Sequence, residues 1–170
     1  MRWLWLSFLI LAFDQLTKYI VRQSLELYES VPVFSGFNIT LGHNNGALFS
    51  FLSDAGGWQR WFLITLSTII SFVVIFWIRA TPVHRKWLCC SLALILGGAI
   101  GNMLDRIVYG YVIDFFDVSL GFLPIRLFNP WPTFNIADSA ITAGIIMLVI
   151  DTFWFDNAMV SIPAAKSDKG

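Results

Sequence analysis

Two aspartates lie beside the ends of long apolar segments, where their carboxylates could do chemistry. Asp114 stands in the run YVIDFF at 111–116, and Asp138 stands in FNIADSA at 134–140. Carboxylates are costly in or near hydrocarbon, so each is a functional candidate by default. Two at comparable depth indicate a pair that shares one proton, the arrangement that activates water against a peptide bond.

Each aspartate also has a simpler explanation. Asp138 could cap a helix, because a carboxylate near a helix N-terminus accepts hydrogen bonds from free backbone N–H groups. Asn135, three residues earlier, competes for that cap and would leave Asp138 for other work. Asp114 has apolar neighbours and a weaker structural explanation, and Asp117 is its nearest competitor.

The composition is that of an integral membrane protein. The chain has 170 residues, of which 57% are hydrophobic and 13% charged, whereas soluble domains carry about a quarter charged residues. The mean hydropathy is +0.71. The formal net charge is zero, so there is no basic surface to indicate a nucleic-acid partner.

Four segments are long enough to cross a membrane, since a spanning helix needs about 20 mostly apolar residues. They are residues 3–20, 61–78, 87–104 and 137–155. We expect the first to be a retained helix and not a cleaved signal peptide, because Asp14, Gln15 and Lys18 interrupt the place for cleavage. The sequence predicts an all-α membrane protein, with one membrane domain over 1–160 and a flexible cytoplasmic tail over 161–170.

Basic residues predict the orientation of the helices. Four spans put both termini on one side with Arg2, Arg79, Arg85 and Lys86, and the positive-inside rule makes that side cytoplasmic. Loops 22–60 and 105–136 then face outward, and the two aspartates lie at the outer membrane boundary. The bias is partial, because other arginines fall on the outer side: Arg22, Arg60, Arg106 and Arg126.

The first outer loop has the composition of short strands and turns. Residues 31–41 mix β-branched and aromatic residues with Pro and Gly. Residues 44–51 could form a turn and a short helix, which residues 55–57 would end before the second span. The second outer loop contains FNPWP at 128–132, which we expect to be irregular.

Polar residues inside the first span have a structural and a functional interpretation. Asp14 and Lys18 are four residues apart on one helical face. They could neutralise each other, with Lys18 extending to the interface, or they could support a site. Asp151 and Asp156, near the end of the fourth span, are interpreted as interfacial residues without chemistry.

The end of the third span carries another polar face. Asn102, Asp105 and Arg106 could form a hydrogen-bonded helix end with an Asp–Arg pair, or support a site. Arg106 could also meet a phospholipid head group. Gly97 and Gly101 form a small-xxx-small face that would let another helix approach closely.

Other hydrolytic chemistries lack their motifs. The chain has no G-x-S-x-G elbow and no H-E-x-x-H zinc motif. His43 and His84 are far apart, and Cys89 and Cys90 lie within an apolar run as small hydrophobic residues would. We predict neither a metal site nor an organic cofactor.

Five short boxes resemble those of lipoprotein signal peptidase (signal peptidase II). They read DQLTK at 14–18, NNGALFS at 44–50, GGAIGNMLDR at 97–106, VIDF at 112–115 and FNIADS at 134–139. They occur in the family's order and cover about residues 10–155.

The resemblance implies an aspartyl endopeptidase of the bacterial inner membrane. Such an enzyme removes the signal peptide from a prolipoprotein by cutting N-terminal to a cysteine that carries diacylglyceryl. Asp114 and Asp138 would be its catalytic dyad. A surrounding shell would contact substrate, and three further residues would be structural: Asn44, Gly46, Asn102, Arg106 and Asn135 in the shell, and Asp14, Lys18 and Asp105 as structural residues.

The resemblance also implies a setting and partners. Loop 22–60 would form a small β-rich cradle between the first two helices, on the membrane surface. A monomer surrounded by phospholipid is expected, with the family inhibitor globomycin bound at the dyad. We further expect the loop around residues 44–51 to move over the site, with Gly46 as its hinge.

Two other protein classes could use the same carboxylates. Intramembrane carboxylates mark proton relays, so a small proton-coupled transporter is the alternative function. Against it, Asp114 and Asp138 lie near one membrane face, whereas transporter sites lie near the midplane. The third possibility is a structural membrane subunit whose aspartates cap helices.

Overall fold

Four helices long and apolar enough to span a membrane occur among the residues that the structure, a computed structural model, describes: 2–46, 56–119 and 132–155. They are α1 (Trp3–Ser24), α2 (Trp58–Ala80), α3 (Lys86–Val108) and α4 (Ile136–Ile150), which a π-helical turn, η3 (Asp151–Phe155), extends. The four predicted spans are therefore confirmed.

Three helices extend beyond their predicted ends on the side of the sheet. α1 continues to Ser24 instead of ending at residue 20, α2 begins at Trp58, and α3 continues to Val108. Residues 22–24, 58–60 and 105–108 therefore belong to helices and not to outer loops. Hydropathy marks only the hydrocarbon-facing length of a helix, and backbone hydrogen bonding continues beyond it into the polar interface.

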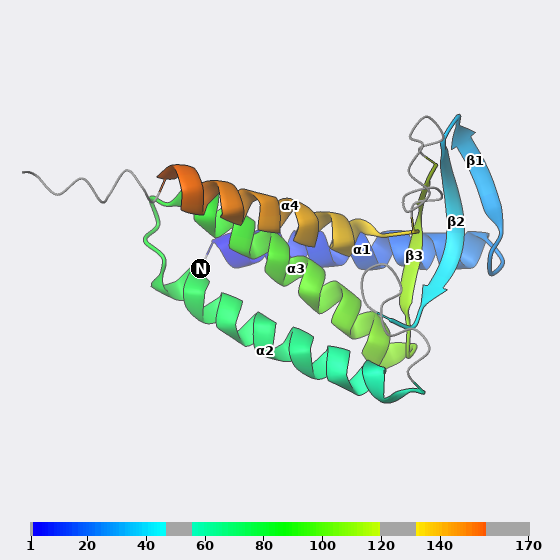
Figure 1. Ribbon diagram of the computed structural model, residues 1–170, viewed down its shortest axis with the longest axis horizontal. Helices are drawn as coiled ribbons and strands as arrows, with labels where there is room; N and C mark the ends of the chain where they lie inside the picture. Colours follow the sequence, from blue (N-terminus) through cyan, green and yellow to red (C-terminus); the bar gives the residue numbers. More distant parts are fainter. Residues whose placement is uncertain (1, 47–55, 120–131, 156–170) are drawn as a thin grey trace, which may run out of the picture.

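α3 is the central helix and packs against α1, α2 and α4 (Figure 1). Its glycines make the close approach possible. A Cβ at Gly97 would lie 2.8 Å from the backbone oxygen of Ser7 in α1, and one at Gly98 would meet the backbone of Ala137 in α4. Space for α1 and α4 therefore exists only because these positions lack side chains, as small residues at membrane helix interfaces allow.

A three-stranded antiparallel sheet lies at one end of the helices, and the N-terminus lies at the other (Figure 1). Its strands are β1 (Ser30–Phe34), β2 (Phe37–Asn44) and β3 (Val112–Val118), in that order. The predicted cradle was incomplete, because it was assigned to loop 22–60 alone. The loop predicted over 105–136 adds β3, whose β-branched and aromatic residues suit a strand, and β3 carries Asp114.

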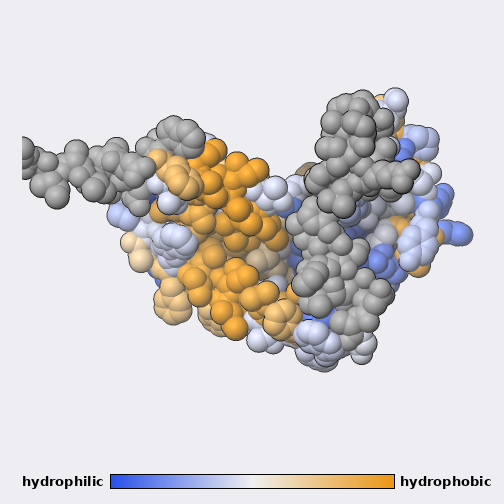
Figure 2. Space-filling model, viewed as in Figure 1, coloured by the Kyte–Doolittle hydropathy of each residue, from blue (hydrophilic) through white to orange (hydrophobic). Residues whose placement is uncertain are grey.

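The surface divides along the long axis of the molecule. Figure 2 shows a broad apolar face over the helices and a mostly polar one over the sheet. Large side chains such as Trp5, Phe72 and Phe76 are exposed on the helices, as expected of surfaces that meet lipid. At the end away from the sheet, Arg85 and Asp151 form a 2.6 Å ion pair in which Asp151 is buried.

Several predicted segments lie outside the described residues. They are most of the loop over 44–51, most of the irregular run at 128–132, and the tail after residue 155.

Candidate active site

The structure brings the two candidate aspartates to a common partner, Asn135. The Asn135 amide nitrogen donates to Asp114 Oδ1 at 2.7 Å. Its amide oxygen accepts the backbone N–H of Asp138 at 2.8 Å. Asp114 arrives from β3 and Asp138 from the first turn of α4, so elements distant in sequence meet at one buried amide.

Each carboxylate also accepts a hydrogen bond from the side-chain amide of another asparagine. Asn44, the last residue of β2, donates to Asp114 Oδ2 at 3.0 Å. Asn102 of α3 donates to Asp138 Oδ1 at 2.7 Å. Gly46 joins this centre, because its N–H donates to Asn44 Oδ1 at 2.9 Å and its oxygen accepts the Arg106 guanidinium at 2.6 Å. All five predicted shell residues therefore lie around the two aspartates: Asn44, Gly46, Asn102, Arg106 and Asn135.

Asp138 also serves the helix cap, which the sequence interpretation had given to Asn135. The two residues form a capping box: Asp138 Oδ2 accepts the backbone N–H of Asn135 at 3.3 Å while Asn135 accepts that of Asp138. The expectation that Asn135 would free Asp138 from the cap is wrong. The reciprocal bonds lock one oxygen of Asp138 to the helix start, and Oδ1 carries the contact to Asn102.

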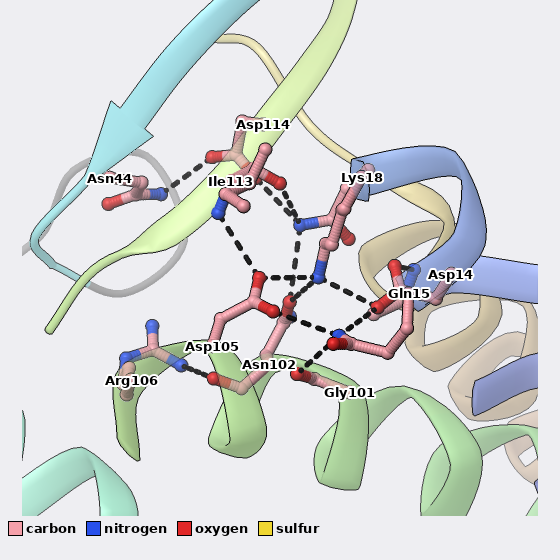
Figure 3. A network of polar contacts seen from close by, with 12 residues as sticks. Asp14, Gln15, Lys18, Asn44, Gly101, Asn102, Asp105, Arg106, Ile113 and Asp114 are labelled. Atoms are coloured by element: carbon pink, nitrogen blue, oxygen red, sulfur yellow. Dashed lines mark hydrogen bonds and ion pairs between the residues drawn. The ribbon is translucent and has the colours of Figure 1, made fainter. Parts of the chain in front are cut away.

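A buried cluster of charged side chains lies close to Asp114 (Figure 3). The Lys18 ammonium lies 2.8 Å from Asp14 Oδ2, 2.8 Å from Asp105 Oδ2 and 3.1 Å from Asn102 Oδ1. Lys18 is 1% exposed. We call Asp14, Lys18 and Asp105 the charge cluster.

The charge cluster corrects two expectations. Lys18 does not extend to the interface but points inward, because α3 presents a second carboxylate and an amide oxygen to it. Asp105 pairs with Lys18 and not with its neighbour Arg106. The pairing of Asp14 with Lys18 itself is present, but it is part of a three-residue network across two helices.

The charge cluster also fixes the backbone beside each candidate aspartate. Asp14 Oδ1 accepts the N–H of Ala137, one residue before Asp138, at 2.9 Å. Asp105 Oδ2 accepts the N–H of Ile113, one residue before Asp114, at 3.2 Å. The cluster thereby holds the start of α4 and the start of β3 to the same cation.

Arg106 turns inward and does not meet the membrane surface as one expectation had it. Its guanidinium donates to the backbone oxygens of Gly46 at 2.6 Å and Asn102 at 3.2 Å. The side chain is buried, and its Nε has no hydrogen-bond partner among the described residues. A buried donor of this kind beside two carboxylates is available to an oxygen of a bound molecule.

The environment of Asp114 favours its protonated form. Burial, and then the nearby negative charge of Asp138, raise the pKa of Asp114 to about 7, against the opposing hydrogen bond from Asn44. A carboxyl that ionises near neutrality beside a second carboxylate can exchange a proton during a reaction.

Sequence reasoning gave no role to Gln15 and weighed Asp117 only as a competitor. Gln15 donates to Asp105 Oδ1 at 2.8 Å and so supports the charge cluster. A signal was present, since a glutamine beside Asp14 in an apolar span needs a buried partner. Asp117 accepts from Asn38 (3.2 Å) and Thr40 (3.0 Å) on the sheet, away from Asn135.

Removal of the Lys18 ammonium should destabilise the fold. Lys18→Met leaves Asp14 and Asp105 buried without their cation, and breaking a buried pair in this way costs about 3–5 kcal/mol. The measurement is the midpoint of thermal unfolding of the purified protein in detergent. Lys86→Met, at an exposed position, is the matched control and should leave the midpoint unchanged. Equal midpoints for the two variants would contradict the role of the cluster.

Known proteins share both the sequence and this architecture. The family model described as "Signal peptidase (SPase) II" matches residues 6–154. The lipoprotein signal peptidase of Psychromonas ingrahamii is 47% identical over 93% of this chain and 88% of its own length. That of Acinetobacter baylyi is 45% identical over 98% of this chain and 89% of its own.

A solved structure agrees. A bacterial membrane enzyme determined by the in meso method at 2.3 Å resolution superposes with a TM-score of 0.78 at 27% identity, covering 99% of this chain and 93% of the other. These likenesses do not support the transporter alternative. The match over nearly the whole chain, on helices and boxes that carry the paired aspartates, means that this chain belongs to the signal peptidase II family of aspartic-type proteases.

Proposed function

We propose that Asp114 and Asp138 are the catalytic dyad with which this membrane peptidase removes signal peptides from prolipoproteins. Family membership supplies the reaction. The observation that carries the residue assignment is that Asn135 donates to both carboxylates: its side-chain nitrogen donates to Asp114 Oδ1 and its backbone N–H donates to Asp138 Oδ2. The substrate would carry diacylglyceryl on its cysteine, and the bond cut would lie N-terminal to that cysteine.

The chemistry follows from two close carboxylates that share one proton. The ionised carboxylate removes a proton from water as the water oxygen attacks the scissile carbonyl carbon. The protonated carboxyl donates its proton to the developing oxyanion. When the C–N bond breaks, the protonated carboxyl donates its proton to the leaving amine, and the ionised carboxylate takes a proton from a hydroxyl of the tetrahedral intermediate as the product carboxyl forms. The pair thereby returns to one proton. The shared proton belongs to the pair and not to one residue.

The surrounding side chains would prepare this pair and hold the substrate. Asn44, Asn102 and Asn135 donate to the carboxylates and so limit their rotation. The Lys18 ammonium and the Asn135 amide nitrogen face Asn102 Oδ1, which directs the Asn102 amide nitrogen to Asp138. Arg106, beside Gly46, is the candidate to bind a substrate carbonyl through its free Nε.

The location of the dyad suits a lipid-modified substrate. Asp114 and Asp138 lie where the sheet meets the apolar helices, so acyl chains could stay in the bilayer while the peptide bond enters the site. We infer that this end faces outward and that both termini are cytoplasmic, since Arg2, Arg79, Arg85 and Lys86 belong to the opposite side by sequence. The enzyme would act as a monomer among inner-membrane phospholipids, with globomycin competing at the dyad.

Replacing either carboxyl should abolish cleavage. Asp114→Asn and Asp138→Asn each remove a proton-transfer group, and general acid–base catalysis contributes about 10²- to 10⁴-fold. Release of the signal peptide from a diacylglyceryl-modified prolipoprotein measures the loss on a gel. Asp117→Asn, on the same strand but paired with Asn38 and Thr40, is the control and should cleave normally. Cleavage by a folded Asp114 or Asp138 variant would refute the assignment.

Cleavage should decline as the pH rises through about 7. The pKa of Asp114 is raised to about 7, and above it the pair loses the proton that the reaction needs, so the acid is lost with increasing pH. The profile of kcat/KM between about pH 5 and about pH 9 tests this. Thermal midpoints at each pH control for unfolding. A rate that still increases at the alkaline end would contradict the shared-proton pair.

The unlipidated precursor should be a poor substrate. Without acyl chains the peptide bond is not held at the depth of the dyad, and misplacement of a reacting bond costs about 100-fold in rate. The comparison is kcat/KM for one precursor with and without diacylglyceryl, in the same detergent. Equal values would show that the lipid plays no part in recognition.

A further inference from the structure

The side chains of the last two residues of β2, His43 and Asn44, contact β3 on opposite faces of the sheet. The His43 ring stacks on the Tyr111 ring, with centroids 3.7 Å apart and planes 20° apart. The next side chain, Asn44, donates to Asp114 Oδ2 at 3.0 Å. Successive side chains of a strand point to opposite faces, so the aromatic contact and the hydrogen bond to the dyad lie back to back.

The strand register makes both contacts diagonal. His43 is opposite Ile113 and Asn44 is opposite Val112, so each side chain reaches a residue two positions from its partner. Diagonal neighbours lie about 7–8 Å apart, and their Cβ atoms are somewhat closer, so two facing rings, or an amide and a carboxylate, can meet across this distance. The two contacts therefore fix the same short piece of β2 along the direction of the strand.

This end of β2 needs such a constraint. The pairing of β2 with β3 is interrupted by a register shift between Ile39 and Gly42, so an unbroken ladder does not transmit the register to Asn44. The strand ends at Asn44. A slip of one residue would move Asn44 to the other face of the sheet, away from Asp114.

The His43–Tyr111 pair is anchored to the helices. Tyr111 stacks on Tyr109 with centroids 6.1 Å apart, and the Arg22 guanidinium lies 4.3 Å from the Tyr109 ring centre. Arg22 belongs to the last turn of α1, and Tyr109 caps the C-terminus of α3. The stack of these four side chains joins β2 to the ends of α1 and α3.

His43 is suited to this contact as a neutral ring. Burial, and then the positive charge of Arg22, lower the pKa of His43 below its ordinary value. The imidazole is therefore uncharged at neutral pH, and it stacks without placing a second cation near Arg22.

We propose that His43 and Tyr111 are positioning residues for the reaction: their stack holds the outer end of β2 in register and so keeps the Asn44 amide on Asp114. The inference rests on the proposed dyad. Neither ring touches the carboxylates, and both act through Asn44.

The test compares His43→Ala with His43→Phe, which keeps a stacking ring. His84→Ala, at the other histidine and exposed, is the matched control. His43→Ala should lower kcat about tenfold, the scale of one lost hydrogen bond to a charged group. His43→Phe should restore kcat, and His84→Ala should match the parent.

The pH profile separates positioning from simple destabilisation. The Asn44 hydrogen bond favours ionised Asp114, so its loss raises that pKa. His43→Ala should therefore move the decline near neutral pH upward by about 0.5–1 unit. Asn44→Ala should do the same, and His43→Ala should add nothing in its presence, because both changes remove one interaction.

The outcomes distinguish this inference from the dyad assignment. An inactive Asp114→Asn beside a parent-like His43→Ala overturns the positioning role alone, whereas an active Asp114→Asn overturns the dyad. Additive effects of His43→Ala and Asn44→Ala also overturn the positioning role. If His43→Ala does not fold, Tyr111→Leu and Tyr111→Phe repeat the comparison from the other ring, and equal activity of these two refutes the stack.

Discussion

The Lys18 ammonium is buried between Asp14 and Asp105, and both strand β3 and helix α4 are held in place through those two carboxylates. Burying three charges is expensive and is compensated only when every group is paired and hydrogen-bonded. Here Asp14 Oδ1 also accepts the backbone N–H of Ala137, and Asp105 Oδ2, which faces Lys18, also accepts that of Ile113. Ala137 and Ile113 each precede one candidate catalytic aspartate. The charge cluster therefore holds the start of α4 and the start of β3, which are distant in sequence, in fixed positions relative to each other.

The site also requires α1 and α4 to pack closely against α3, and this packing depends on the same charge cluster. A Cβ at Gly101 of α3 would lie 2.7 Å from Asp14 Oδ2, so the carboxylate occupies the space that a side chain would take. Gly98 gives α4 the equivalent room at Ala137. In lipid the hydrophobic effect does not drive helices together, so packing and polar contacts carry the association. The glycines of α3 and the charged residues of α1 thus form the same helix–helix interface.

Much of this arrangement could be predicted from the sequence. Most of the features that could not be predicted share one physical reason. The apolar lengths predicted four spans, and Asp114 and Asp138 were conspicuous because charge is rare there. Strand β3 and the second carboxylate on Lys18 were not predicted. Each is a contact between segments far apart in sequence, such as Lys18 with Asp105, whereas periodicity reports only local structure. The capping box was missed for another reason: Asn135 and Asp138 were treated as competitors, although the motif uses both.

The two proposed catalytic carboxyls also occupy unlike environments. Asp138 accepts a backbone N–H at the first turn of α4, where the helix dipole favours negative charge. Asp114 lies on a strand between Ile113 and Phe115, both buried, and its pKa is raised to about 7 chiefly by burial. A strand and a helix start thus bring one carboxyl each to the same residue, Asn135, which donates to both. Two carboxyls held this close favour sharing one proton between them.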